Sequence, residues 1–249
     1  ANALLAATWS TAFVFGMAGG GFLALLGPPM AIALDGATFL VAGALAAGLP
    51  TMIPDRDIPK RFSLGLELRE AFVAARATPV LFSAVLAKLP VALAWGGGWL
   101  ALQLVAADET PFGPTPLSIG VLQAMRGLGT GIGPVLAARA IAGGRDVRGV
   151  VPWTMLCVLA SVAVFVSASA PVVLLCAVLG WGAGSGATWV LTATVVQTHA
   201  GDARIGRIAA LDELTNVVTM NVGVLCAAGL MTAGLSRPIA CLVPPLLAL

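Results

Sequence analysis

Residues 51–78 read TMIPDRDIPKRFSLGLELREAFVAARAT and form the longest polar stretch in the chain. They hold nine charged side chains, although the whole chain has only 13 basic and 11 acidic residues. On both sides the sequence is apolar for about twenty residues at a time, the length that an α-helix needs to cross a bilayer. The polar stretch therefore separates a short hydrophobic part of the chain from a long one.

The overall composition is typical of an α-helical membrane protein. The 249 residues are 59% hydrophobic and 10% charged, with a mean hydropathy of +1.00, whereas a soluble domain has about 25% charged residues. A transmembrane β-barrel needs alternating polar and apolar residues, and runs such as Val150–Val166 do not alternate. We therefore predict an all-α integral membrane protein.

Several other classes of function find little support in the residues. A net charge of +2 does not indicate a nucleic-acid partner, and there is no GxxxxGK[ST] motif for a nucleotide. The four cysteines lie in apolar runs without ligand spacing, so no metal site is expected. Ser185 lies in a glycine-rich run, but a serine nucleophile needs a base, and His199, the only histidine, falls in a predicted loop. We expect neither an enzyme nor a cofactor.

The apolar segments give the predicted order of membrane spans. Within the polar stretch, apolar and charged residues over positions 64–76 predict a short amphipathic helix at the membrane interface. The predicted segments are Leu4–Leu26, Met30–Leu49, Val80–Ala106, Pro116–Ala138, Val150–Ser169, Val172–Gln197, Ile208–Leu235 and a short last one, Pro238–Leu249.

Basic residues gather in alternate connections between these segments. Such a bias sets the orientation of a membrane protein, so we predict that residues 51–78, 139–149 and 198–207 lie on the cytoplasmic side. The first segment then runs outward. The basic residues of these three connections are Arg56, Lys60, Arg61, Arg69, Arg76, Arg139, Arg145, Arg148, Arg204 and Arg207, against only Arg237 in the intervening ones.

A few charges lie inside the predicted spans, where each costs about 2.5–3.5 kcal/mol on insertion scales. Arg126 is near the middle of its segment, one turn from Gln123, and cannot easily reach either interface. We expect it to face a water-filled cavity or an acidic partner. Asp35, at a similar depth, is a candidate for that partner. The alternatives are a structural ion pair or a partner on a helix outside this chain.

Other charges lie nearer the predicted cytoplasmic ends of their segments. Lys88 either contacts substrate or extends its ammonium group toward the interface. Asp212 and Glu213 open the segment Ile208–Leu235, where a role at the helix start or in pairing with a loop is favoured over ligand contact.

Glycines inside the spans, above all Gly16, Gly19, Gly20 and Gly21, let membrane helices approach closely. They serve either plain helix packing or helices that slide and bend during transport.

Four short motifs resemble those of the major facilitator superfamily, and within it the drug and siderophore exporters. Residues 16–21, GMAGGG, resemble the antiporter motif G-P-x-x-G-G of the family's fifth helix, with Met17 in place of the proline. Residues 133–145 resemble the second-half copy of the loop motif G-x-x-x-D-R-x-G-R, with Ala138 in place of the acidic residue. Residues 204–207, RIGR, are similar to the start of the eleventh helix, and residues 34–39, LDGATF, are similar to the sixth.

The resemblance implies a truncated helical bundle that covers the last eight of twelve helices. Residues 1–50 would be the last two helices of the N-terminal half, 51–78 the central cytoplasmic loop, and 79–249 the C-terminal half with an incomplete last helix. The chain itself begins with Ala1 rather than Met and ends about half a span into its last segment, so we expect a fragment of a longer protein.

The resemblance also implies a function: export of small amphiphilic molecules from a bacterial-type inner membrane by alternating access, powered by protons, by a protein that is monomeric at full length. The residues offer no clear proton-carrying carboxylate. The alternative is a non-transporting membrane scaffold or a degenerate half-transporter. Besides protons and membrane lipid, the expected partner is a small-molecule substrate, for which the candidate contacts are Asp35, Lys88, Gln103, Gln123 and Arg126.

Two further groups of residues take roles from the resemblance. Four tryptophans either line an apolar pocket or anchor the helices at the interface; they are Trp95, Trp99, Trp181 and Trp189. The candidate cytoplasmic gating residues are Arg139, Gly143, Arg145, Arg204, Gly206, Arg207, Asp212 and Glu213.

Overall fold

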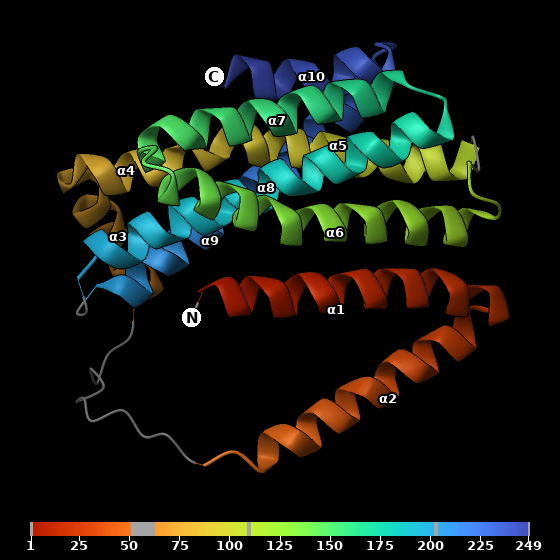
Figure 1. Ribbon diagram of the computed structural model, residues 1–249, viewed down its shortest axis with the longest axis horizontal. Coiled ribbons are helices and arrows are strands. Elements are labelled where there is room, and N and C mark those ends of the chain that lie inside the picture. Colours follow the sequence, from red (N-terminus) through yellow and green to blue (C-terminus); the bar gives the residue numbers. More distant parts are fainter. Residues whose placement is uncertain (1, 51–62, 109–110, 202–203, 249) are drawn as a thin grey trace.

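The computed structural model describes residues 2–50, 63–108, 111–201 and 204–248, and within these ranges all regular structure is helical (Figure 1). The prediction of an all-α chain is therefore confirmed. The elements are α1 (Asn2–Leu23), the 3₁₀ turn η1 (Ala24–Leu26), α2 (Pro28–Ala47), α3 (Leu64–Ala77), α4 (Pro79–Leu86), α5 (Lys88–Asp108), α6 (Thr115–Ala142), α7 (Val147–Ser167), α8 (Pro171–His199), α9 (Ile205–Thr232) and α10 (Arg237–Leu247).

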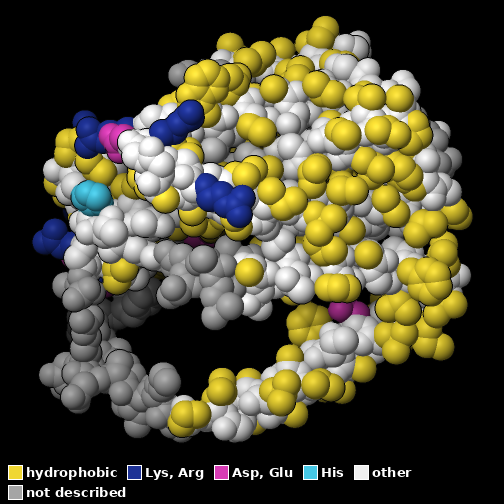
Figure 2. All heavy atoms as spheres, in the orientation of Figure 1, with side chains coloured by type: hydrophobic (Ala, Val, Ile, Leu, Met, Phe, Trp, Pro, Cys, Tyr) yellow, Lys and Arg dark blue, Asp and Glu magenta, His cyan; other side chains and the backbone are white. Residues whose placement is uncertain are grey.

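The helices have the length and the surface of membrane spans. Six helical stretches in the described part of the chain are long and apolar enough to cross a membrane. Large apolar side chains cover their outward faces (Figure 2); Phe15, Leu40 and Leu225, for example, are each at least 70% exposed. A soluble protein would bury such surface. The chain is therefore a multi-pass membrane protein.

Helix α6 lies inside the bundle, between α1 on one side and α8 on the other, and α8 in turn packs against α7. Glycines make this close approach possible, because an added Cβ at Gly129, Gly133, Gly182 or Gly186 would overlap the backbone of the facing helix. Helix α5 packs against α9, and the short α10 lies against α5, α9 and α7. This arrangement places the middle of α6 deep in the bundle.

Only one of the four glycines in the antiporter-like motif of α1 is in close contact with α6. A Cβ at Gly21 would lie 2.8 Å from the Cα of Gly120, whereas Gly16, Gly19 and Gly20 have open space around them. Further along the same interface, Ser10 Oγ donates a 2.6 Å hydrogen bond to the Gly127 carbonyl.

Helix α2 turns away from the rest of the molecule after Gly27, whose φ of 101° lies in the region that favours glycine (Figure 1). No residue of α2 is buried. Its side chains, Asp35 among them, consequently lie far from the centre of the bundle.

The predicted third span is one apolar stretch, Pro79–Asp108, whose helix is interrupted near its start. Helix α4 ends at Leu86 and α5 begins at Lys88, with Ala87 between them. Pro90 has no N–H to donate to the Leu86 carbonyl, which accounts for the break. The amphipathic helix predicted over positions 64–76 is present as α3, which buries Ala71 and Ala75.

The described parts of the three basic connections lie at one end of the bundle, on the left in Figure 1: α3, the α6–α7 turn and the α8–α9 turn. Arg56, Lys60 and Arg61 lie outside the described residues. Figure 2 shows lysine and arginine side chains gathered toward that end. That this end faces the cytoplasm remains a prediction.

Candidate functional site

Arg126, in the middle of α6, is the most enclosed charge in the bundle, with 2% of its surface exposed. Its Nε donates a 2.8 Å hydrogen bond to Gln123 Oε1, one turn earlier. Aromatic rings from α1, α5 and α8 surround the guanidinium group, whose central carbon lies 4.9 to 5.3 Å from four ring centroids. These rings belong to Phe13, Trp95, Trp99 and Trp181.

The predicted pairing of Arg126 with Asp35 is wrong. Asp35 is exposed on α2, and no acidic side chain of the described residues forms an ion pair with Arg126. The reason is the direction of α2, which leaves the bundle at Gly27. Cation–π attraction from the rings takes over part of the compensation, since a desolvated ring contact is worth about 2 kcal/mol or more.

Asp212 forms a buried ion pair with Lys88. Lys88 Nζ lies 2.5 Å from Asp212 Oδ2, and the two side chains are only 4% and 9% exposed. The same ammonium group lies 4.8 Å from the ring centroid of Trp189. The pair therefore joins the start of α5 to the second turn of α9.

These contacts correct two expectations. Lys88 does not extend to the interface, and Asp212 lies inside the bundle rather than at a loop. The neighbouring Glu213 is exposed, because one residue along a helix turns the side chain by about 100°.

A small cavity of about 30 Å³ lies beside the ion pair. It is large enough for a water molecule but too small for an organic substrate, so the interior is closed in this conformation. Its lining comes from α5, α8 and α9 and consists of Lys88, Val91, Ala92, Trp95, Ser185, Thr188, Trp189 and Asn216.

Several buried polar atoms around Arg126 and Lys88 have no hydrogen-bond partner among the described residues. They are Trp95 Nε1, Gln123 Nε2, Trp181 Nε1, Ser185 Oγ and Asp212 Oδ1. A buried polar atom left unpaired costs about 1–3 kcal/mol. A cluster of them in one place indicates that the interior accommodates water or a polar ligand.

The structure thus brings together part of the predicted site. Trp95 is shared by the two buried charged groups, Arg126 and the Lys88–Asp212 pair. Its ring faces the Arg126 guanidinium group and also lines the cavity beside Lys88. Gln103 is half-buried on α5 and is not hydrogen-bonded to the other candidates. Phe13 and Asn216 were not predicted as site residues. Ser185 was considered only as a nucleophile, a role set aside because the sequence offers it no base.

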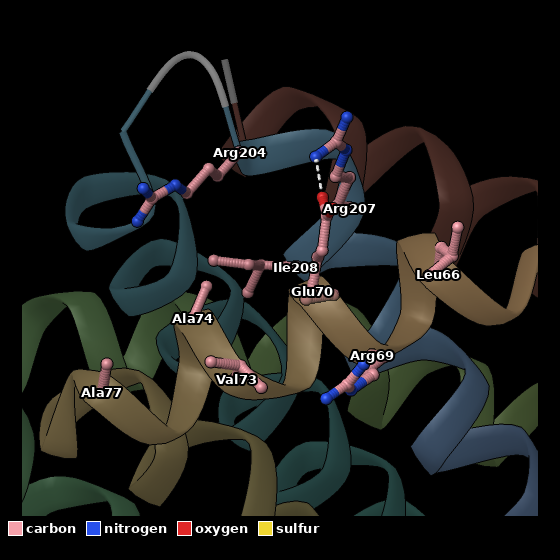
Figure 3. Close-up of a pocket in the computed structure, with 10 residues that line it drawn as sticks. Leu66, Arg69, Glu70, Val73, Ala74, Ala77, Arg204, Arg207 and Ile208 are labelled. Atoms are coloured by element: carbon pink, nitrogen blue, oxygen red, sulfur yellow. Dashed lines mark hydrogen bonds and ion pairs between the residues drawn. The ribbon is translucent and has the colours of Figure 1, made fainter. Parts of the chain in front are cut away.

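A second concave region, of about 450 Å³, lies between α3 and the start of α9 (Figure 3). On its rim Arg207 pairs with Glu67 Oε2 at 2.5 Å and with Glu70 Oε2 at 2.7 Å. Arg69 and Arg204 also line it, but Figure 3 shows their guanidinium groups well apart from each other. The region is a contact between two helices rather than a converging anion site.

The remaining gating candidates lie on the surface at the same end. Arg139 and Arg145 are exposed, and Gly206 has open space around it. At the end of α6 the backbone takes a positive φ, 90°, at Gly144 rather than at Gly143, and the Arg145 N–H donates to the Ala140 carbonyl. This is a helix C-terminal motif, and it gives Gly144 a clearer structural role than Gly143.

Fold and site together define a multi-pass α-helical membrane protein with a buried polar and aromatic centre. Comparison with family models, with curated proteins and with solved structures finds no match to this chain.

Proposed function

We propose that this chain belongs to a secondary transporter of the major facilitator type, which exports small amphiphilic molecules across a bacterial cell membrane by alternating access. The observation that carries the proposal is the pair of buried cations, Arg126 and Lys88, inside a bundle of membrane-spanning helices. Charges at such depth are costly and are typically kept for binding or transport. The surrounding tryptophans supply apolar surface for the body of an amphiphile.

The order of the helices fits this proposal. In a transporter of two rocking halves, α1 and α2 belong to the first half, α3 to the connection, and α4 to α10 to the second half. The interface of α1 with α6 is then a contact between the halves, and Arg126 lies beside that contact, against Phe13 of α1. A ligand bound at Arg126 would therefore affect whether the two halves separate at this contact.

The buried ion pair of Lys88 and Asp212 is the candidate for a contact that changes during transport in this proposal. It joins the start of α5 to α9, at the predicted cytoplasmic end. Breaking the pair would loosen α5 from α9, so the state of the pair and the movement of these helices would be linked.

The test is efflux of a fluorescent amphiphile from cells that produce the full-length protein. We expect Arg126→Ala to abolish efflux while the protein still inserts in the membrane. Arg148→Ala, which removes an exposed arginine at the start of α7 that is not among the site or gating candidates, is the control and should retain efflux. Normal efflux by Arg126→Ala would remove this residue from the mechanism.

The closed interior also fits a non-transporting membrane scaffold. The two proposals differ in energy dependence. A proton-coupled exporter loses efflux when the proton gradient is collapsed, whereas the amount of dye retained by cells with a scaffold does not depend on the gradient.

A further inference from the structure

The charges in the interior of the bundle do not balance. Three charged side chains of the described residues are buried, namely Lys88, Arg126 and Asp212. The single carboxylate is already paired with Lys88. The guanidinium group of Arg126 is left without a counter-charge, and an unpaired buried charge calls for an anion.

Hydrogen-bond donors around Arg126 outnumber acceptors, just as positive charge there exceeds negative charge. A guanidinium group has five N–H donors, and in the described part of the chain the only acceptor that contacts it is Gln123 Oε1. Three further donors have no acceptor: the indole N–H groups of Trp95 and Trp181 and the amide of Gln123. All three belong to residues that touch Arg126.

The aromatic rings do not remove this excess of donors. Ring faces attract the positive charge of the guanidinium group, but they are weak hydrogen-bond acceptors. What they offer is flat apolar surface on several sides of the charge. A ligand that matches this environment has an apolar, planar body and a group of anionic oxygens.

From these two imbalances we infer that the interior around Arg126 binds small organic anions, whose carboxylate-type oxygens accept hydrogen bonds from Arg126, Gln123 and an indole N–H. This names the substrate class of the proposed transporter and rests on that proposed function. The body of the anion packs against Trp95 and Trp181. Because the neighbouring cavity holds only about 30 Å³, the anion enters after α5 and α8 have moved apart.

Three probes of the same shape test the charge. They are 1-naphthoate (anion), 1-naphthamide (neutral) and 1-naphthylmethylammonium (cation), each titrated calorimetrically into the purified full-length protein in a neutral detergent. We expect 1-naphthoate to bind roughly tenfold or more tightly than either of the others, since charge-assisted hydrogen bonds are the stronger ones.

Variants then locate the anion. Arg126→Gln should weaken 1-naphthoate binding by about tenfold or more, and Arg126→Lys by less, since it keeps the charge but loses the fork of donors. Arg148→Gln removes an exposed charge at the start of α7, outside the site and gating candidates, and should leave binding unchanged. If Arg126→Gln does not fold, Arg126→Lys and the three probes on the unaltered protein still test whether an anion binds at Arg126.

Equal binding of the amide and the naphthoate would overturn the inference of an anion, while efflux that depends on Arg126 would still support transport. Failure of all three probes to bind, which would mean that only water fills the site, would also overturn it. So would naphthoate binding that is unchanged in Arg126→Gln, because the anion would then lie elsewhere. Loss of transport itself is measured separately, by the efflux of the fluorescent amphiphile.

Discussion

Two sets of ion pairs hold the start of α9 to earlier helices, and they differ chiefly in burial. Asp212 pairs with Lys88 of α5 in the interior, where both side chains are less than a tenth exposed. Arg207, five residues earlier, pairs with Glu67 and Glu70 of α3 at the surface, where its own side chain is 42% exposed. Both sets pair a carboxylate with a cationic side chain, but the first is shielded from solvent and the second is not. Removing one partner should therefore have very different consequences in the two places.

The buried pair should show the largest effect. Asp212→Asn leaves the Lys88 ammonium group without a counter-charge beside Trp189, and breaking a buried pair in this way costs about 3–5 kcal/mol. We expect a marked loss of thermal stability of the purified protein in detergent. The measurement is the midpoint of aggregation on heating, compared with that of the unaltered protein.

Replacing both partners separates charge from packing. The double variant Lys88→Met, Asp212→Leu removes both charges and should be more stable than Asp212→Asn, because apolar residues of similar volume can replace a buried pair with little loss. If the double variant is as unstable as the single one, the loss comes from packing. If Asp212→Asn is as stable as the unaltered protein, the pair does not hold α5 to α9.

The surface cluster should respond weakly and in a salt-dependent way. Arg207→Gln removes two exposed ion pairs, each worth about 0.2–1 kcal/mol. The change in melting midpoint should be small at low salt and should shrink further at high salt, because salt screens exposed charges over about 10 Å at 0.1 M. Glu70→Gln, at the more exposed of the two glutamates, removes one of the two pairs and is the matched control. An effect of Arg207→Gln as large as that of Asp212→Asn, and independent of salt, would contradict this account.

The contrast also indicates how much of the structure can be predicted from the sequence. The helical membrane class follows from composition, and α3 follows from the spacing of its apolar residues. The sequence also identifies Arg126 and Lys88 as unusual, because a charge inside an apolar run is conspicuous whatever its partner. Their partners depend on which helices adjoin, and that depends on packing between segments distant in the chain.

Asp212 illustrates the limit. In the sequence it follows a basic loop and resembles Glu213 beside it, so both were assigned to the cytoplasmic surface. Only the packing of α9 against α5 determines that Asp212 points inward and Glu213 outward. The prediction for Asp35 failed for another reason. Asp35 and Arg126 lie at similar depths along their segments, but a similar depth does not bring two side chains close in space. The turn at Gly27 carries α2 away from the bundle.

The prediction with the smallest expected effect on stability tests which end of the bundle faces the cytoplasm. Ser63 precedes α3 and Ser236 precedes α10, at opposite ends of the bundle (Figure 1), and both are exposed. Ser→Cys at either position changes one exposed atom, so we expect no measurable loss of stability. With the four native cysteines replaced, a membrane-impermeant maleimide should label Ser236→Cys in intact cells and Ser63→Cys only after permeabilisation.

That outcome would place the Arg207 cluster at the cytoplasmic surface and the Lys88–Asp212 pair deeper in the membrane, above that surface. The reverse labelling would invert the topology and place both sets of ion pairs toward the outer side. The burial difference between the two sets of ion pairs would stand in either case, because it depends on packing and not on orientation. Labelling thus tests the orientation of the protein in the membrane separately from the packing that the ion pairs hold together.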